Sequence, residues 1–309
     1  MPIVWQISVL HLNKKTLLSG VLLKGIPFTY DEQIGNFRNL LKVLRSYFIG
    51  VYANKEIAIS VNDKIIYTNT DKYGSFSVVV DFLCKGELTI KIADSNKPLK
   101  ILQSYPIVFQ NTESPFDVIS DIDDTIIVSY TADFFKRIGT LAFTAPQKRK
   151  TIGFTQKLFE EFKKQDVRVF YVSKSESNLF AMLTAFIELN NLPKGMLILT
   201  PYLKFGQLLH PKKGRDYKLK NIRFIFENSG TKDFVLMGDD SQRDMEIYTD
   251  IAKEFPERVM KIYIRQTKRK VLPRQKRMWI ELKATGVPVK YFKADTPVDK
   301  LNEIAQLKN

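Results

Sequence analysis

Short apolar and alternating runs dominate the first 110 positions of the chain. Each run is bounded by turn residues and predicts a β-strand, and one stretch with apolar residues at helical spacing predicts a helix. The predicted strands are 4–12, 56–61, 65–70, 75–81, 87–92 and 105–110, and the predicted helix is 31–48. Several short strands and one helix favour a small β-sandwich-like accessory domain over residues 1–110.

The pattern changes after the polar segment 111–115, which we interpret as a domain junction. Strand and helix patterns then alternate along the chain. The predicted strands are 116–121, 167–172, 196–199, 234–238 and 259–264, and the predicted helices are 154–165, 176–190, 217–227 and 242–254. This alternation predicts an α/β fold over residues 115–309, a doubly wound parallel sheet with both faces covered. A length of 309 residues agrees with two domains.

Polar side chains gather where three of these strands end. The residues are Asp121, Asp123 and Thr125 at the first strand, Ser173 at the second, and Asp239, Asp240 and Asp244 at the third. Because ligands of doubly wound sheets bind at the carboxyl ends of the strands, we expect these side chains to share one site, with Thr125 ordering the turn. For the first cluster taken alone, an Asp-rich turn is the alternative.

Carboxylates this close repel one another unless a cation neutralises them. The chain has one cysteine, Cys84, and two histidines, His11 and His210. These are too few for a zinc site or a histidine-based triad. Oxygen ligands suit Mg²⁺, which is therefore the predicted cofactor.

The order Asp121, Ser173, Lys218, Asp239 resembles the four-motif order of the haloacid-dehalogenase-like phosphatases. Segments 120–126, 171–179, 192–195 and 238–248 narrow this resemblance to the catalytic domain of the actin-patch-associated, Mg²⁺-dependent phosphatidate phosphatases, over about residues 115–308. The sequence departs from this family's pattern at two places. Residues 175–177 read Ser-Glu-Ser where the family usually has Ser-Pro-Trp, and Asp240 stands where a serine is usual.

The resemblance implies a mechanism, stated here as a hypothesis. Asp121 attacks phosphorus and becomes an aspartyl phosphate, while Asp123 protonates the leaving oxygen and later activates water. Ser173 and Lys218 stabilise the phosphoryl oxygens, and Lys220 is the rival candidate for the lysine. The predicted Mg²⁺ ligands are Asp121, Asp239, the backbone carbonyl of Asp123, and either Asp244 or Asp240.

The intervals between these motifs are too short for a large cap domain, although a compact lid at 130–150 is an alternative. An uncapped site is open to solvent and suits a bulky substrate, because small metabolites usually need enclosure.

Basic residues are concentrated near the C-terminus. The net charge is +15, and residues 258–293 carry twelve basic side chains and one acidic one, Glu281. This stretch predicts contact with an anionic phospholipid surface, with Trp279 at the interface. A solvated basic loop with a packed indole is the alternative. Two further basic clusters, 148–150 and Lys212, Lys213 and Arg215, are candidates for binding a substrate phosphate.

The sequence thus predicts a Mg²⁺-dependent phosphomonoester hydrolase with a phosphatidate-like substrate. A nucleic-acid end (3′-) phosphatase and a non-catalytic membrane-docking adaptor stay open as alternatives. No apolar run reaches 18 residues, and the N-terminus lacks a signal-peptide pattern. We therefore expect a cytoplasmic protein that attaches peripherally to membranes.

Overall fold

The computed structural model describes residues 2–31, 33, 36–95, 97–123, 125–126, 153–204, 214–293, 296–297 and 303. It divides into two compact units. Unit 1 comprises the described residues up to 111 together with 175–185 and 199–204, and unit 2 comprises the remaining described residues. Because two later segments belong to unit 1, the units are not simply successive in sequence. The division into domains 1–110 and 115–309 stays a prediction.

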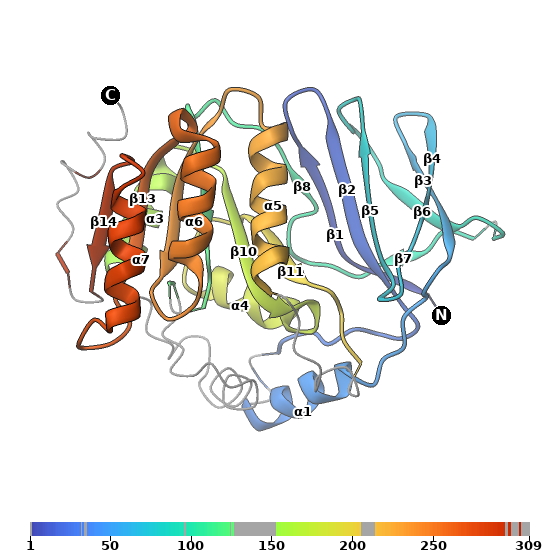
Figure 1. Ribbon diagram of the computed structural model, residues 1–309. Coiled ribbons are helices and arrows are strands. Elements are labelled where there is room, and N and C mark those ends of the chain that lie inside the picture. Colours follow the sequence, from blue (N-terminus) through green and yellow to red (C-terminus); the bar gives the residue numbers. More distant parts are fainter. Residues whose placement is uncertain are drawn as a thin grey trace. The chain divides into compact units, whose positions relative to one another are not determined.

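Unit 1 contains two β-sheets (Figure 1). The larger sheet has the order β5-β2-β1-β7, with β8 also paired to β1, and the smaller has the order β4-β3-β6. Their strands are β1 (Ile3–His11), β2 (Thr16–Leu23), β3 (Glu56–Val61), β4 (Lys64–Asn69), β5 (Ser75–Val80), β6 (Thr89–Ile92), β7 (Lys100–Ile101) and β8 (Val108–Phe109). Side chains of both sheets, among them Ile7, Leu18, Ile57 and Ile90, form one hydrophobic core. The helix α1 (Asn36–Ser46) lies outside the two sheets.

The sequence prediction missed β2 and overestimated the strand at 105–110. Strand β2 is a nearly continuous apolar run that is buried on both sides, so it lacks the alternation of a half-exposed strand. Gly20 interrupts its apolar run. A side chain there would meet the ring of Phe76, with an added Cβ only 2.8 Å from Cζ.

Unit 2 is built on a sheet of order β11-β10-β9-β12-β13-β14. The strands are β9 (Phe116–Ser120), β10 (Val169–Glu176), β11 (Met196–Thr200), β12 (Asp233–Asp239), β13 (Val259–Arg265) and β14 (Val289–Phe292), the last residues of β10 and β11 being assigned to unit 1. The pairings β10–β9, β9–β12, β12–β13 and β13–β14 are all parallel. The prediction of an α/β fold with a parallel sheet is therefore confirmed.

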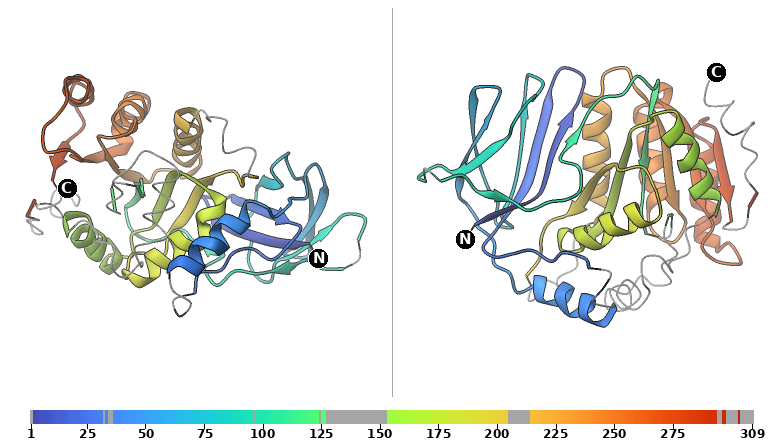
Figure 2. Two further views of the ribbon diagram at one scale, coloured as in Figure 1. Left: turned by 90° about the horizontal axis from the view of Figure 1, so that it is seen from below. Right: turned by 180° about the vertical axis from the view of Figure 1, so that it is seen from behind.

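Helices cover both faces of this sheet. Helices α5 (Gly214–Asn228), α6 (Asp244–Glu254) and α7 (Pro273–Lys283) lie on one face and α3 (Gly153–Lys164) on the other, as Figure 2 shows. The remaining helices among the described residues are α4 (Phe180–Leu189), which spans both units, and the short 3₁₀ helices Ser177–Leu179 and Pro256–Arg258. None of the helices in the described part of the chain is long and apolar enough to cross a membrane.

Helix α7, strand β14 and the short 3₁₀ helix Pro256–Arg258 of unit 2 were not predicted. The buried positions of α7 are Gln275, Met278 and Leu282, and basic residues surround them. Because this apolar face is narrow, the helical periodicity of apolar residues in this part of the sequence is weak.

Gly195 lets the start of β11 approach β10 closely. A Cβ added at Gly195 would lie 2.2 Å from the carbonyl oxygen of Val169. We therefore expect Gly195→Ala to lower the free energy of unfolding by about 1–3 kcal/mol, measured by urea denaturation. Gly25→Ala is the control, because its Cβ would make only an ordinary contact of 3.7 Å with Ile49. Equal stability of the two variants would contradict this packing.

Candidate active site

Three buried carboxylates meet at the carboxyl edge of the unit 2 sheet. Asp121 follows β9, Asp239 ends β12 and Asp244 begins α6. All three side chains are buried, and one oxygen of each lies within 4.8 Å of the others. The backbone N–H of Asp121 donates to the carbonyl of Met237 at 2.8 Å, which fixes the end of β9 against β12. The parallel register thus brings together acids that are far apart in the sequence.

Lys218 lies between two of these carboxylates. Its Nζ donates to Oδ1 of Asp121 at 2.8 Å and to Oδ1 of Asp244 at 2.7 Å, and the side chain is fully buried. Burial alone would lower the pKa of Lys218, but Asp121 and Asp244 outweigh burial and hold this pKa well above its usual value. Its rival in the sequence prediction, Lys220, is exposed. The geometry therefore places Lys218, and not Lys220, with the acids.

Burial in the protein interior opposes the ionisation of Asp121 and Asp239. Burial raises the pKa of Asp121 well above its usual value, and Asp244 and Asp239 add to this effect while Lys218 opposes it. Burial, followed by the charge of Asp244, raises the pKa of Asp239 to about 7. Such shifts mark a site that would gain from a further positive charge.

Two oxygens in the cluster are buried and unsatisfied. Oδ2 of Asp121 and Oδ2 of Asp239 accept no hydrogen bond from any described residue. The other oxygen of Asp239 accepts from the backbone N–H groups of Ser241 and Gln242. Buried carboxylate oxygens normally have partners, so the two open oxygens fit the coordination of a hard divalent cation.

Asp123 and Ser173 form the second part of the site. The hydroxyl of Ser173 donates to Oδ2 of Asp123 at 3.2 Å, and both side chains are buried. Ser173 reaches this position because β10 pairs with β9 in parallel, with Tyr171 opposite Ser120. The carbonyl of Thr125 accepts from the hydroxyl of Thr155 at 2.9 Å, so the backbone of Thr125 takes part in holding the turn.

The carboxylate of Asp240 has hydrogen-bond partners outside the carboxylate cluster. Its Oδ1 accepts from the backbone N–H and the hydroxyl of Thr267 at 2.9 and 2.5 Å, and its Oδ2 accepts from the hydroxyl of Tyr291. Its backbone carbonyl accepts from Nε2 of Gln275 at 2.9 Å. Asp240 therefore connects β12 to β14 and α7, whereas Asp244 lies with Asp121 and Asp239.

Gly238 makes the close approach of α6 possible. A Cβ at Gly238 would lie 2.7 Å from Cβ and Oδ2 of Asp244 and from the ring of Tyr248. The backbone N–H of Asp239 donates to Oδ2 of Asp244 at 3.3 Å. Only glycine lets the first turn of α6 lie against the end of β12, so Gly238 positions Asp244 in the cluster.

Lys174 is a residue near the cluster that sequence reasoning missed. Burial lowers its pKa, and Lys218 adds to this effect, while Asp244 and Asp121 oppose it. Lys174 is thus close enough to the acids to interact with their charges. Neighbouring residues of a strand point to opposite faces, so its position next to Ser173 gave no reason to include it.

Several predicted features lie outside the described residues. These are the interval 130–150 with its basic cluster 148–150, His210, Lys212 and Lys213, and the side chain of Arg215.

The basic stretch 258–293 divides into two groups. Five members contact other groups of unit 2 or are buried there. Arg258 donates to the carbonyl of Lys232, Lys261 and Lys290 pair with Glu303, Arg274 pairs with Glu246, and Arg265 is buried in β13. The other seven are exposed: Lys268, Arg269, Lys270, Lys276, Arg277, Lys283 and Lys293. Trp279 is half-buried and stacks on Tyr291 at 4.9 Å between ring centroids, which agrees with the alternative of a packed indole.

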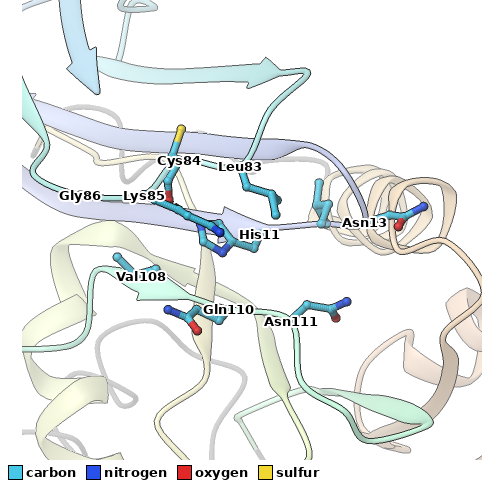
Figure 3. A pocket seen from close by; sticks show the side chains of 10 residues that line it. His11, Asn13, Leu83, Cys84, Lys85, Gly86, Val108, Gln110 and Asn111 are labelled. Atoms are coloured by element: carbon cyan, nitrogen blue, oxygen red, sulfur yellow. The ribbon is translucent and has the colours of Figure 1, made fainter. Parts of the chain in front are cut away.

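A separate pocket of about 590 Å³ lies within unit 1 (Figure 3). Its lining includes His11, Lys85, Gln110 and Asn111. One ring nitrogen of His11, Nε2, is 2.7 Å from the carbonyl oxygen of Cys84. None of the predicted catalytic residues lines this pocket.

Residues 116–266 match the family model described as the catalytic domain of phosphatidate phosphatase APP1. The matched segment is similar to this family and contains Asp121, Ser173, Lys218, Asp239 and Asp244. The resemblance predicted from the motifs is thus confirmed.

Curated relatives agree with this family. Phosphatidate phosphatase APP1 of Saccharomyces cerevisiae is 30% identical over 207 residues, which are 64% of this chain and 34% of the relative. An uncharacterized protein of Schizosaccharomyces pombe is 26% identical over 213 residues, 65% of this chain and 34% of that protein. The chain spans about a third of the length of these curated relatives.

Among solved structures, a class C acid phosphatase from Bacillus anthracis matches with 13% identity and a TM-score of 0.32. The match covers 55% of this chain and 80% of that chain. This likeness is too low to support a statement about the fold.

Removing Lys218 should unbalance the buried charges. We expect Lys218→Met to lower the free energy of unfolding at neutral pH by about 3–5 kcal/mol, because it leaves buried carboxylates without their cation. Lys220→Met, which removes an exposed lysine of the same helix, should cost less than about 0.5 kcal/mol. Urea denaturation of both variants gives the comparison, and similar losses would show that Lys218 is not the buried partner of the acids.

Proposed function

We propose that this protein is a Mg²⁺-dependent phosphatase of the haloacid-dehalogenase type that releases phosphate from phosphatidate through an aspartyl-phosphate intermediate. The observation that carries the proposal is the convergence of Asp121, Asp239 and Asp244 around Lys218, beside Asp123 and Ser173. The match of residues 116–266 to the APP1 catalytic-domain family supports the same reaction.

The donor set suits Mg²⁺. Asp121, Asp239, Asp244 and the backbone carbonyl of Asp123 would hold the ion, which prefers oxygen ligands. The two buried oxygens of Asp121 and Asp239 that accept no hydrogen bond from the described residues support this assignment. When bound, Mg²⁺ would offset the negative charge of the acids and of the phosphoryl group. The proposal takes Asp244 as the remaining ligand, since the carboxylate of Asp240 is engaged by Thr267 and Tyr291.

In the first step, an oxygen of Asp121 attacks phosphorus and forms a phosphorus–oxygen bond. The bond from phosphorus to the ester oxygen breaks, and the leaving oxygen takes a proton from the carboxyl group of Asp123. Lys218 stabilises the charge on the non-bridging oxygens, and Asp244 keeps its ammonium group in place. Ser173, which is hydrogen-bonded to Asp123, can orient this acid and also donate to the phosphoryl group.

In the second step, water hydrolyses the aspartyl phosphate. The carboxylate of Asp123 accepts a proton from the attacking water, a new phosphorus–oxygen bond forms, and the bond to Asp121 breaks. Inorganic phosphate leaves, and both carboxyl groups return to their starting states.

A membrane-bound substrate is supported by the surface beside the site. The seven exposed basic residues of segment 268–293 lie in and around α7, and Gln275 of α7 is hydrogen-bonded to the carbonyl of Asp240. Two large apolar side chains near them are also exposed, Leu272 by 43% and Ile280 by 63%. Each basic residue near an anionic membrane contributes about 1 kcal/mol, so this surface would favour peripheral attachment.

One substrate panel tests the reaction and the substrate class together. We expect Mg²⁺-dependent phosphate release from phosphatidate in mixed micelles, and little from 3′-phosphorylated oligonucleotides or small sugar phosphates. Asp121→Asn should reduce turnover at least about 10⁴-fold because it removes the nucleophile, while Glu257→Gln, an exposed change, should leave turnover intact.

The panel also separates the alternatives. Turnover confined to oligonucleotides would favour a nucleic-acid end phosphatase, and turnover confined to sugar phosphates would exclude a lipid substrate. Absence of turnover with every substrate would favour the adaptor. Full activity of Asp121→Asn would show that the nucleophile is misassigned.

The pKa of Asp239 predicts how Mg²⁺ should stabilise the protein. Its pKa is about 7 in the folded chain without metal, against an ordinary 3.8. Between these values the folded chain holds a proton that the unfolded chain has lost, so the free energy of unfolding falls as pH rises. Mg²⁺ binds the ionised carboxylates and should offset this loss.

The rise in Tm on adding Mg²⁺ should therefore be larger at about pH 8 than at about pH 5.5, by roughly 5 °C. Calorimetry with Mg²⁺ and with a chelator measures the difference, and Asp239→Asn should reduce it. A Mg²⁺ effect that is equal at both pH values would contradict this assignment of Asp239.

A further inference from the structure

The two faces of α1 differ sharply in their surroundings. On the inner face, Val43 and Tyr47 are buried, and the carbonyl of Ser46 accepts from the hydroxyl of Tyr202 at 2.6 Å. At the other end, Nδ2 of Asn39 donates to the carbonyl of Asp31 at 2.6 Å. These contacts lie within unit 1 and fix which side of the helix faces outward.

The outer face presents large apolar side chains to solvent. Leu41 is 39% exposed, and Phe48, just after the helix, is 72% exposed. Ile26, on the adjacent segment, is 73% exposed. That segment is held beside the end of the helix because the N–H of Lys24 donates to the carbonyl of Gly50 at 2.8 Å. Three exposed side chains of this size in one region of the surface mark an interaction site rather than ordinary surface.

The charges on this helix have one sign. Arg38 and Arg45 are exposed, Lys42 is half-buried, and α1 contains no acidic residue. The carboxylate of Asp31, which precedes the helix, accepts from the N–H of Gln33 at 2.9 Å. A solvent-facing helix normally carries charges of both signs, because like charges at helical spacing repel. Basic residues mixed with Leu and Phe are typical of helices that lie in a membrane interface.

We infer that Ile26, Arg38, Leu41, Arg45 and Phe48, called here the α1 face, dock on an anionic lipid surface. Arg38 and Arg45 contact the headgroups, while Ile26, Leu41 and Phe48 enter the boundary of the acyl chains. An anionic lipid surface would both offset the repulsion between the basic residues and bury the exposed apolar side chains. The inference gives unit 1 a binding role and does not depend on what the acidic site hydrolyses.

A reporter at position 48 tests insertion directly. In the full 309-residue chain, Phe48→Trp should show a blue-shifted emission on phosphatidylcholine vesicles that contain phosphatidylserine, and quenching by brominated acyl chains. Tyr67→Trp is the matched control, because Tyr67 is 60% exposed on β4 of the same unit and is not part of the α1 face. The emission of this control should not shift when vesicles are added.

Charge and apolar variants test the affinity. Arg38→Glu/Arg45→Glu should weaken sedimentation with these vesicles by about 30-fold, which corresponds to about 2 kcal/mol. Leu41→Ser/Phe48→Ser should weaken it by at least about tenfold. Lys97→Glu/Lys100→Glu, with the same change of charge at exposed positions of unit 1, should have a much smaller effect.

The outcomes are separate from those of the catalytic proposal, because no readout uses phosphate release. Unchanged vesicle binding in both α1-face variants, together with an unshifted spectrum for Phe48→Trp, would overturn the inference. An emission shift of the Phe48→Trp variant that depends on protein concentration and not on lipid would also overturn it, and would assign the α1 face to contact between copies of the chain.

Discussion

The site depends on one constraint, the burial of several carboxylates within a few ångströms of one another. Asp121, Asp239 and Asp244 would repel and draw in water if the surrounding framework were loose. The parallel strands β9 and β12 hold two of them in register, and the ammonium group of Lys218 joins Asp121 to Asp244. The protein thus holds several buried carboxylates at one edge of a rigid sheet, where a divalent cation would offset their repulsion.

Helix α6 contributes to the same balance. Asp244 lies in its first turn, where the unsatisfied N–H groups of a helix favour negative charge. Gly238 allows this turn to lie against the end of β12, so that the charge enters the cluster instead of solvent. Asp240, one residue beyond Asp239, instead ties the site to α7 and β14 through Gln275 and Tyr291. The carboxylate of Asp239 therefore lies in the acidic cluster, whereas that of the adjacent Asp240 is held by other parts of unit 2.

The basic residues of the chain likewise fall into two groups. Lys261 and Lys290 converge on the buried carboxylate of Glu303, and Arg258 caps the carbonyl of Lys232. Such residues stabilise unit 2 and are not available to a partner. The exposed bases near α7 and those of the α1 face remain, each beside exposed apolar side chains. A net charge alone could not separate these groups, because charge in a sequence carries no information on burial.

The alternation of strands and helices in the second half of the chain, and the polar residues at the strand ends, could be predicted from the amino-acid sequence alone. Both follow from local chemistry: β12 is an apolar run that stops at Gly238 and Asp239. Strand β2, helix α7 and strand β14 escaped prediction, since their burial comes from neighbours that are distant in the sequence. The tertiary structure was needed to show that Asp244, and not Asp240, lies with Asp121 and Asp239, and that Lys218, and not Lys220, contacts the acids. In each pair the two residues are the same type and lie close together, and they differ only in the direction that the fold gives their side chains.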